Sequence, residues 1–114
     1  MNFDQLHIGN YYKCKEEEVH KFVVDDFKSP ERFEGVLLKD ISLLFLGFTP
    51  VCFTVWSKKG IFLRPHPNIS NLTEALFGST TKRKLRDIQY LHELQDLWRG
   101  IYGEQLEFTK ELLK

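Results

Sequence analysis

One stretch, residues 85–103, constrains the fold of this chain more than any other. Its apolar side chains recur at intervals of three and four residues, which is the spacing of one face of an α-helix: Leu85, Ile88, Leu91, Leu94, Trp98 and Ile101. So wide an apolar stripe is typical of a helix that packs against a sheet. We therefore predict one long amphipathic helix from about residue 84 to residue 102, ended by Gly103 and followed by a short strand.

Runs of β-branched and aromatic residues predict strands in the rest of the chain. Residues 51–56 and 61–64 flank a short glycine-containing segment, residues 57–60, which is the pattern of a β-hairpin. Residues 6–14 and 20–27 have the composition of a second hairpin near the start of the chain. We expect a short third strand at residues 32–36.

Two further segments have helical patterns. Ile41, Leu44 and Phe45 predict a short buried helix over about residues 39–46, with Gly47 in the position that ends a helix. Asn71 is placed to cap a turn of helix over residues 72–77. The predicted fold class is therefore α+β: an antiparallel sheet of about four to six strands, with one long C-terminal helix and one short helix packed on it. At 114 residues, the chain is expected to form a single domain over residues 1–114.

Charge is distributed unevenly along the chain. The formal net charge is zero, so attraction to a polyanion would require a local patch. Residues 1–57 contain six Lys or Arg and nine Asp or Glu, whereas residues 58–114 contain ten and seven. The two halves therefore carry −3 and +3, and an anionic partner should prefer the second half.

The run Lys82-Arg83-Lys84-Leu85-Arg86 is the densest basic segment. Cations at the start of a helix oppose its dipole, so helix stability does not explain their position. One interpretation is contact with nucleic-acid phosphates or with an acidic protein surface, and the other is a solvated loop. The candidate binding residues are the cations of this run together with those of the predicted hairpin: Lys82, Arg83, Lys84, Arg86, Lys58, Lys59 and Arg64. No aromatic residue is interleaved in the run.

Catalytic and metal-binding patterns are not found in the sequence. The histidines and cysteines are scattered without the spacing of a zinc site, and no glycine-rich phosphate loop is present. Cys52 lies in an apolar strand pattern, where we expect a buried, inert thiol. His92 and Gln95 lie together beside the apolar face of the predicted helix. They are expected to bond backbone groups of the sheet, with exposure at a partner surface as the alternative. We expect a non-enzymatic protein without metal or cofactor.

The first residues, Met-Asn-Phe-Asp-Gln-Leu, lack the basic and apolar regions of a signal peptide. The longest apolar run, residues 41–48, is far shorter than the about 20 residues that span a membrane. We therefore expect a cytoplasmic protein with reduced cysteines and no membrane association.

Several blocks of the chain resemble a family of small uncharacterised proteins of bacterial phages and integrated mobile elements. These blocks are LHIGNY at residues 6–11, LLFLGF at 43–48, KGIFL at 59–63, IQYLHELQDLW at 88–98 and YGEQL at 102–106. The resemblance carries no established activity and no catalytic residues. Members typically have Leu-Thr-Glu-Glu where this chain has Leu38-Lys39-Asp40-Ile41, and the basic run 82–84 also departs from the family pattern.

The resemblance leads to one functional hypothesis and the basic run to another. A small mobile-element protein without catalytic residues is expected to bind and inhibit a host system, such as a CRISPR effector nuclease or its guide RNA. The alternative is a nucleic-acid-binding accessory protein that uses residues 82–86 on phosphates. A small enzyme is the third and least supported hypothesis, because no nucleophile and base can be paired. The sequence leaves the oligomeric state open.

Overall fold

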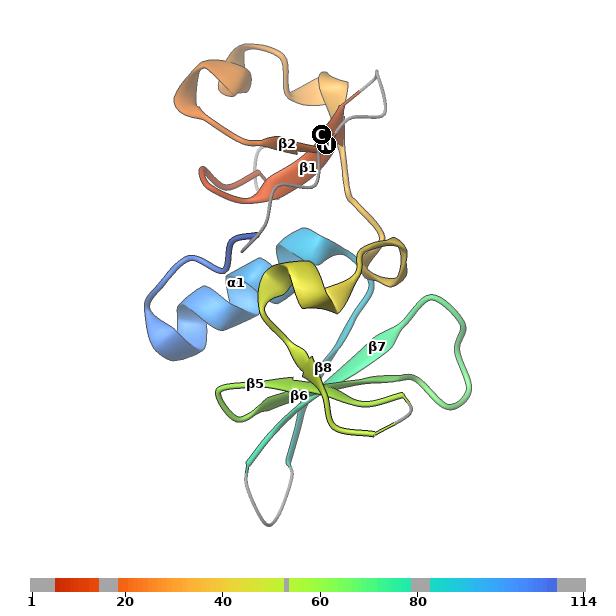
Figure 1. Ribbon diagram of the computed structural model, residues 1–114. Coiled ribbons are helices and arrows are strands. Elements are labelled where there is room, and N and C mark those ends of the chain that lie inside the picture. The colour runs from red at the N-terminus through yellow and green to blue at the C-terminus, as the bar shows by residue number, and fades with distance from the viewer. Residues whose placement is uncertain (1–5, 15–18, 53, 79–82, 109–114) are drawn as a thin grey trace. The chain divides into compact units, whose positions relative to one another are not determined.

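The computed structural model describes residues 6–14, 19–52, 54–78 and 83–108, which fall into two compact units (Figure 1). The terminal unit consists of residues 1–36 and 90–107, and the central unit consists of residues 37–89 and 108–114. Two antiparallel sheets and one α-helix form the fold, which confirms the predicted α+β class. The single domain over residues 1–114 stays a prediction.

The sheet of the terminal unit has the strand order β2-β1-β3. Its strands are β1 (Tyr11–Cys14), β2 (Val19–Lys21) and β3 (Phe33–Glu34), and both neighbours run antiparallel to β1. The predicted N-terminal hairpin and third strand are thereby confirmed. The second strand is shorter than predicted, because 3-10 helices follow it at Val24–Lys28 and Pro30–Arg32. The Asp26 carboxylate accepts a hydrogen bond of 2.8 Å from the Val23 N–H and so stabilises the first of these turns.

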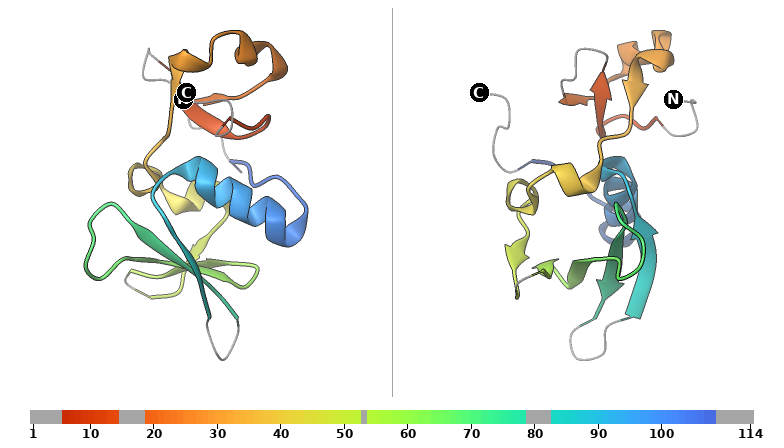
Figure 2. Two further views of the ribbon diagram at one scale, coloured as in Figure 1. Left: turned by 180° about the vertical axis from the view of Figure 1, so that it is seen from behind. Right: turned by 90° about the vertical axis from the view of Figure 1, so that its right-hand side faces the viewer.

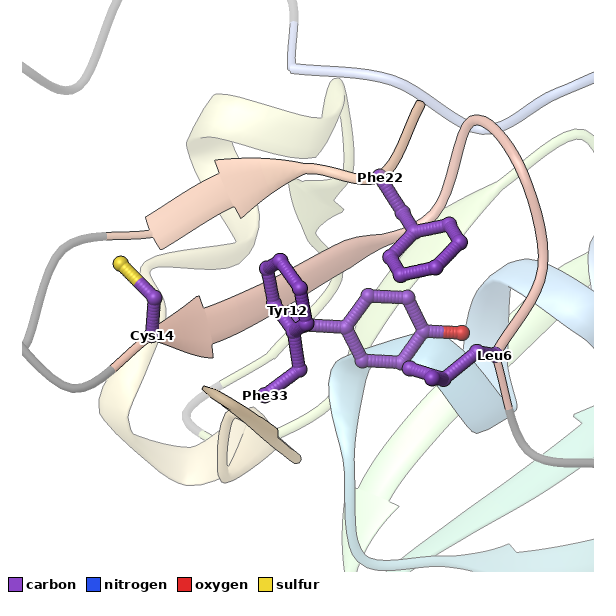
Figure 3. Packing of buried hydrophobic residues seen from close by; sticks show 5 residues of the cluster. All are labelled: Leu6, Tyr12, Cys14, Phe22 and Phe33. Carbon is purple, nitrogen blue, oxygen red and sulfur yellow. The ribbon is translucent and has the colours of Figure 1, made fainter. Parts of the chain in front are cut away.

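Aromatic rings form most of the buried hydrophobic cluster of the terminal unit (Figure 3). Tyr12 and Phe22 meet edge to face with centroids 5.7 Å apart, and Phe22 meets Phe33 in the same way at 5.2 Å. Leu6 and Cys14 complete the buried cluster. The edge-to-face arrangement places the positive edge of one ring on the negative face of the next, which adds to the stabilisation from burial.

Helix α1 (Leu91–Tyr102) belongs to the terminal unit and is shorter than the predicted helix. Its side chains Leu91, Leu94 and Trp98 are buried, as the apolar stripe predicted. The helix starts at Leu91 because the Glu93 carboxylate accepts a 2.9 Å hydrogen bond from the Tyr90 N–H, as in a capping box. It ends before Gly103, whose φ of 68° confirms the predicted stop.

No strand follows α1 in the described residues 104–108, contrary to the prediction. Leu106 is nevertheless buried, and its carbonyl accepts a 2.9 Å hydrogen bond from the Gln95 side chain. The segment is thus held by a helix side chain instead of a neighbouring strand.

The central unit contains a five-stranded antiparallel sheet in the order β4-β5-β6-β7-β8 (Figures 1 and 2). Its strands are β4 (Thr49–Pro50), β5 (Trp56–Lys58), β6 (Ile61–Pro65), β7 (Thr73–Phe77) and β8 (Arg83–Ile88). The predicted hairpin is confirmed in β5 and β6. Lys59 and Gly60 form its turn with φ of 48° and 88°, as a type I′ turn requires.

Strand β5 shares only Trp56 with the strand predicted over residues 51–56, and this changes the environment of Cys52. The Val51 and Cys52 N–H groups both donate to the Val55 carbonyl, at 2.8 and 3.4 Å, so this segment turns before the strand begins. Cys52 is exposed, which makes the prediction of a buried thiol wrong, whereas Cys14 is buried.

Three predicted helical segments of the central unit have other structures. Residues 39–46 form two 3-10 helices, Leu38–Asp40 and Leu43–Leu46, separated by extended backbone and ended by Gly47 with φ of 86°. Residues 72–77 lie in β7, where strand pairing on both sides outweighs the local helical pattern. Residues 84–88 lie in β8, whose pairing with β7 likewise prevents the helix from extending before residue 91.

Candidate nucleic-acid interface

Charge separates sharply between the two units. The terminal unit contains six Lys or Arg and twelve Asp or Glu, a formal charge of −6. The central unit contains ten Lys or Arg and four Asp or Glu, a formal charge of +6. The two halves of the sequence differ less in formal charge. The acidic residues of α1 and of the segment after it lie in the second half of the sequence but belong to the terminal unit. All seven predicted site residues belong to the central unit.

The cations of the basic run lie on a strand at the end of a sheet. Arg83, Lys84 and Arg86 are exposed on β8, the last strand in the sheet order, while Lys82 lies outside the described residues. The expected position at the start of a helix is therefore wrong, and the argument from the helix dipole does not apply. Charged side chains on an edge strand also discourage pairing with other chains, which is the structural alternative to a binding role.

Strand register places an exposed aromatic ring beside this run. Arg83 pairs with Phe77, Phe77 with Ile61 and Ile61 with Lys58, so that these residues form one row across four strands. Phe77 has 41% of its surface exposed to solvent. The sequence did not indicate this neighbour, because the β7–β8 connection separates Phe77 from the basic run.

Two of the predicted binding cations are held by a buried carboxylate. Glu74 Oε2 lies 3.2 Å from Lys84 Nζ, and Glu74 Oε1 lies 3.2 Å from Arg64 Nε. The hydrogen bond from Lys84, opposed by burial and assisted by Arg64, lowers the pKa of Glu74. Hydrogen bonds to Asp87 and then to Glu74 raise the pKa of Lys84. Arg64 and Lys84 therefore stabilise the sheet, and their charge is largely neutralised.

The hairpin lysines have different environments. Lys58 Nζ donates a 2.7 Å hydrogen bond to the Leu46 carbonyl, which fixes its side chain within the central unit. Lys59 is exposed in the hairpin turn. The other predicted cations that the structure describes, Arg83 and Arg86 on β8 and Lys59 in the turn, are all exposed, and Arg86 Nε donates a 3.4 Å hydrogen bond to the Asp87 carbonyl.

A pocket of about 340 Å³ opens in the central unit. Leu38 and Leu63 are buried residues of its lining, and Trp56 is half-buried there. Lys39 and Arg64 line it as well, and both are exposed. Of these residues the sequence had indicated only Arg64, because the others come together from segments with no shared motif.

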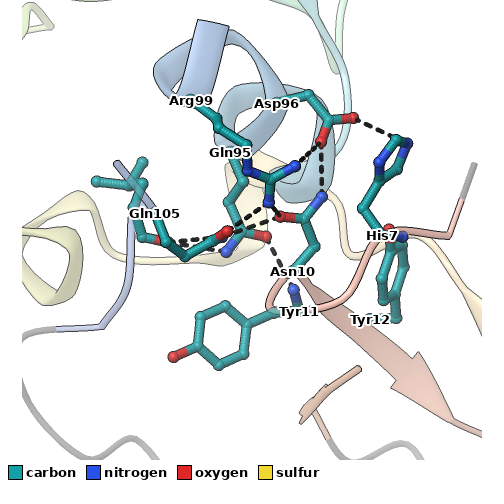
Figure 4. Close-up of polar contacts among 9 residues, drawn as sticks. His7, Asn10, Tyr11, Tyr12, Gln95, Asp96, Arg99 and Gln105 are labelled. Atoms are coloured by element: carbon teal, nitrogen blue, oxygen red, sulfur yellow. Dashed lines mark hydrogen bonds and ion pairs between the residues drawn. The ribbon is translucent and has the colours of Figure 1, made fainter. Parts of the chain in front are cut away.

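A cluster of polar side chains ties α1 to the segments before β1 and after α1 (Figure 4). The fully buried Asn10 donates to Asp96 at 2.7 Å and accepts from Arg99 at 2.9 Å. Gln105 donates to Asn10 at 2.9 Å, and its amide oxygen accepts from Arg99. Because these groups satisfy one another, we assign the cluster to the stability of the terminal unit.

Gln95 has the structural role that the sequence predicted. Its amide oxygen accepts from the Tyr11 N–H at 2.8 Å, and its amide nitrogen donates to the Leu106 carbonyl at 2.9 Å. His92 is buried and stacks on Tyr90 with centroids 5.6 Å apart. A backbone hydrogen bond from His92 stays a prediction.

Within the described part of the chain, no group of three His, Cys, Asp or Glu side chains is arranged to hold a metal ion. The described helices include none that is long and apolar enough to cross a membrane. Comparison of the chain with protein-family models, with curated proteins and with solved structures finds no match.

Proposed function

We propose that this protein is a non-enzymatic binding protein whose central unit contacts nucleic acid. The contact surface, named here the β8 surface, consists of Arg83, Arg86, Lys59 and Phe77. The observation that carries the proposal is the charge of +6 on the central unit, combined with the exposure of its cations on β8. The phage or mobile-element resemblance is compatible with this role, because such elements act on nucleic acid.

Phosphate contact is the chemistry that suits these side chains. Arginine presents several N–H donors in a plane and binds phosphate oxygens through two of them at once. Arg83 and Arg86 pair with Phe77 and Ala75 of β7, and therefore occupy neighbouring positions along one strand pair. Each phosphate neutralised by such a residue releases condensed counterions, which supplies affinity that does not depend on sequence.

Phe77 adds a surface that bases can stack on. Proteins that bind single strands combine a basic groove with aromatic side chains, because every base has an apolar face. An exposed phenylalanine directly opposite an arginine in the register supplies both elements at one place. We therefore expect single-stranded nucleic acid to bind better than a duplex.

Charge reversal on β8 tests the proposal. We expect Arg83→Glu/Arg86→Glu to reduce the affinity for a fluorescein-labelled single strand by at least tenfold, measured by fluorescence anisotropy at low salt. The matched control is Lys28→Glu/Arg32→Glu, which makes the same change of charge at exposed positions of the terminal unit. An equal loss of affinity in both variants would show that only the net charge of the protein matters. It would contradict a role for β8.

Inhibition of a host defence nuclease is the second candidate, and the charge of −6 on the terminal unit favours it. A nuclease effector that carries guide RNA has basic channels for nucleic acid, and an acidic protein surface can occupy such a channel. The inhibitor would act in the cytoplasm of the bacterial host cell. Co-elution with a purified CRISPR effector and loss of its cleavage activity would support this function. The absence of both effects across a panel of effectors would count against it.

A pull-down from host lysate, performed with and without nuclease treatment, separates the two candidates. Partners that disappear after nuclease treatment are held through nucleic acid, as the first candidate requires. A protein partner that survives the treatment supports the second.

A further inference from the structure

We infer that the pocket of the central unit holds one unstacked base of a single-stranded nucleic acid. This inference rests on the proposed function and deepens it, because it names the form of nucleic acid and the group that is bound. Small-molecule pockets in proteins start at about 300 Å³, so the volume of about 340 Å³ suits one flat heterocycle better than a large ligand.

The lining of the pocket fits the face of a base. Leu38 and Leu63 have only 3% and 1% of their surfaces exposed and give an apolar floor. Trp56 is half-buried and lines the pocket. Stacking of a base on an aromatic side chain contributes affinity and does not depend on the identity of the base.

The exposed part of the lining fits the phosphate and the polar edge of a nucleotide. Lys39 is an exposed cation of the lining, whereas Arg64 is paired with Glu74, and none of the described residues that line the pocket is acidic. Asn71 is exposed there and offers an amide, which both donates and accepts hydrogen bonds. A neutral apolar ligand would leave this charge unused, whereas an anionic ligand with an aromatic group uses both the lining and the charge.

The strand register connects the pocket with β8. Trp56 pairs in register with Leu63, Leu63 with Ala75, and Ala75 with Arg86 on β8, so that these four residues form one row on one face of the sheet. Neighbouring strands lie about 4.8 Å apart, so β6 and β8 are separated by about 10 Å. Phosphates that follow a base in the pocket can therefore reach the cations of β8 along the same strand of nucleic acid.

Bases in a duplex are stacked and paired and cannot enter such a pocket without being flipped out, which costs free energy. The inference therefore predicts discrimination between strands that carry bases and strands that do not. The probes are a twelve-nucleotide oligothymidylate and an abasic deoxyribose-phosphate strand of the same length. Binding is followed by anisotropy and by tryptophan fluorescence, in which Trp56 is the responsive group because Trp98 is only 1% exposed.

We expect the oligothymidylate to bind about tenfold more tightly than the abasic strand and to quench tryptophan fluorescence. Trp56→Leu should abolish the quenching and the difference between the two strands. Because Trp56→Leu removes a packed side chain, Lys39→Glu serves as a second variant at an exposed position, with Lys28→Glu as its charge-matched control. Lys39→Glu should weaken oligothymidylate binding more than Lys28→Glu does.

The outcomes separate this inference from the proposed function. Equal binding of the two strands without quenching would overturn the base pocket and leave phosphate contact on β8 intact. Binding of neither strand at low salt would overturn both. Quenching that persists in a folded Trp56→Leu variant would also overturn the inference, because the signal would then not come from the pocket.

Discussion

Gly35 lies directly against the ring of Tyr90. A Cβ atom added at Gly35 would stand 2.6 Å from Tyr90 Cδ1, closer than real Cβ contacts come. One residue further along each segment, the Leu91 N–H donates a 2.7 Å hydrogen bond to the Val36 carbonyl. The start of α1 is therefore fixed against the segment after β3, and glycine is required there for lack of space.

Gly35→Ala should consequently destabilise the protein. The ring of Tyr90 cannot yield without moving the start of α1, and such overpacking costs about 1–3 kcal/mol of the free energy of unfolding. Urea denaturation followed by circular dichroism measures it. The matched control is Gly100→Ala in α1, where an added Cβ meets nothing within 4 Å. That variant should gain about 0.5–1 kcal/mol from helix propensity. A Gly35→Ala protein as stable as the wild type would contradict the close approach.

Gln95→Leu should lower the free energy of unfolding, although leucine and glutamine have similar volumes. The substitution removes the side-chain partner that the Tyr11 N–H and the Leu106 carbonyl share in a buried place. An unsatisfied buried polar group costs about 1–3 kcal/mol. The Tyr11 N–H loses its side-chain acceptor, whereas the Leu106 carbonyl keeps a 3.4 Å hydrogen bond from Gln105 Nε2. The loss is measured by the same urea denaturation. A loss below about 0.5 kcal/mol would show that Gln95 is not a bridge between these segments.

The ion pairs of Glu74 should make the stability of the protein depend on pH in the acidic range. Its pKa is lower in the folded protein than in the unfolded chain, because Lys84 and Arg64 bind its charged form. Its stabilising contribution is therefore present above the unfolded pKa of about 4.5 and is lost as the pH falls through the folded pKa. Thermal unfolding of Glu74→Gln should depend less on pH below about 4.5 than that of the wild type. Identical profiles for the two proteins would contradict the ion pairs.

The same substitution should strengthen nucleic-acid binding. Glu74→Gln removes the charge that neutralises Arg64 and Lys84 and raises the net charge of the central unit by one. We expect a severalfold higher affinity for a single strand at low salt, measured by anisotropy. Glu34→Gln, at an exposed carboxylate of the terminal unit, is the control for net charge. An equal or larger gain in the control would show that the effect comes from net charge and not from the release of Arg64 and Lys84.

Local signals in the sequence predicted the hairpin, the helix stops and the buried face of α1. The Lys59-Gly60 turn, Gly47 and Gly103 each have the positive φ that their positions required. These features depend only on residues close in sequence, which is why they could be predicted.

The errors in the fold have a common physical cause. Leu85 and Ile88 fit a helical stripe, but they also fit a strand that begins at Arg83 and pairs with β7. The choice between the two depended on residues 73–77, which were themselves predicted as helix. The pairing of β7 with a strand on each side is a tertiary effect, which the spacing of residues close in sequence does not predict.

The candidate site was predictable in its charges and not in its geometry. The basic run was visible in the sequence, whereas neutralisation of Lys84 depends on the register of Glu74 ten residues away. Lys39 and Trp56 line one pocket only because the 3-10 segment and β5 fold together. No pattern of spacing indicates such a meeting.

The salt dependence of single-strand binding is a direct measure of phosphate contact on β8. Each phosphate contact contributes about −0.7 to the slope of log affinity against log salt concentration for a single strand. We predict a steep negative slope for the wild type, a slope shallower by about 1.4 for Arg83→Glu/Arg86→Glu, and an unchanged slope for Lys28→Glu/Arg32→Glu. A slope near zero in the wild type, or the same slope in the wild type and the Arg83→Glu/Arg86→Glu variant, would contradict phosphate contact on β8.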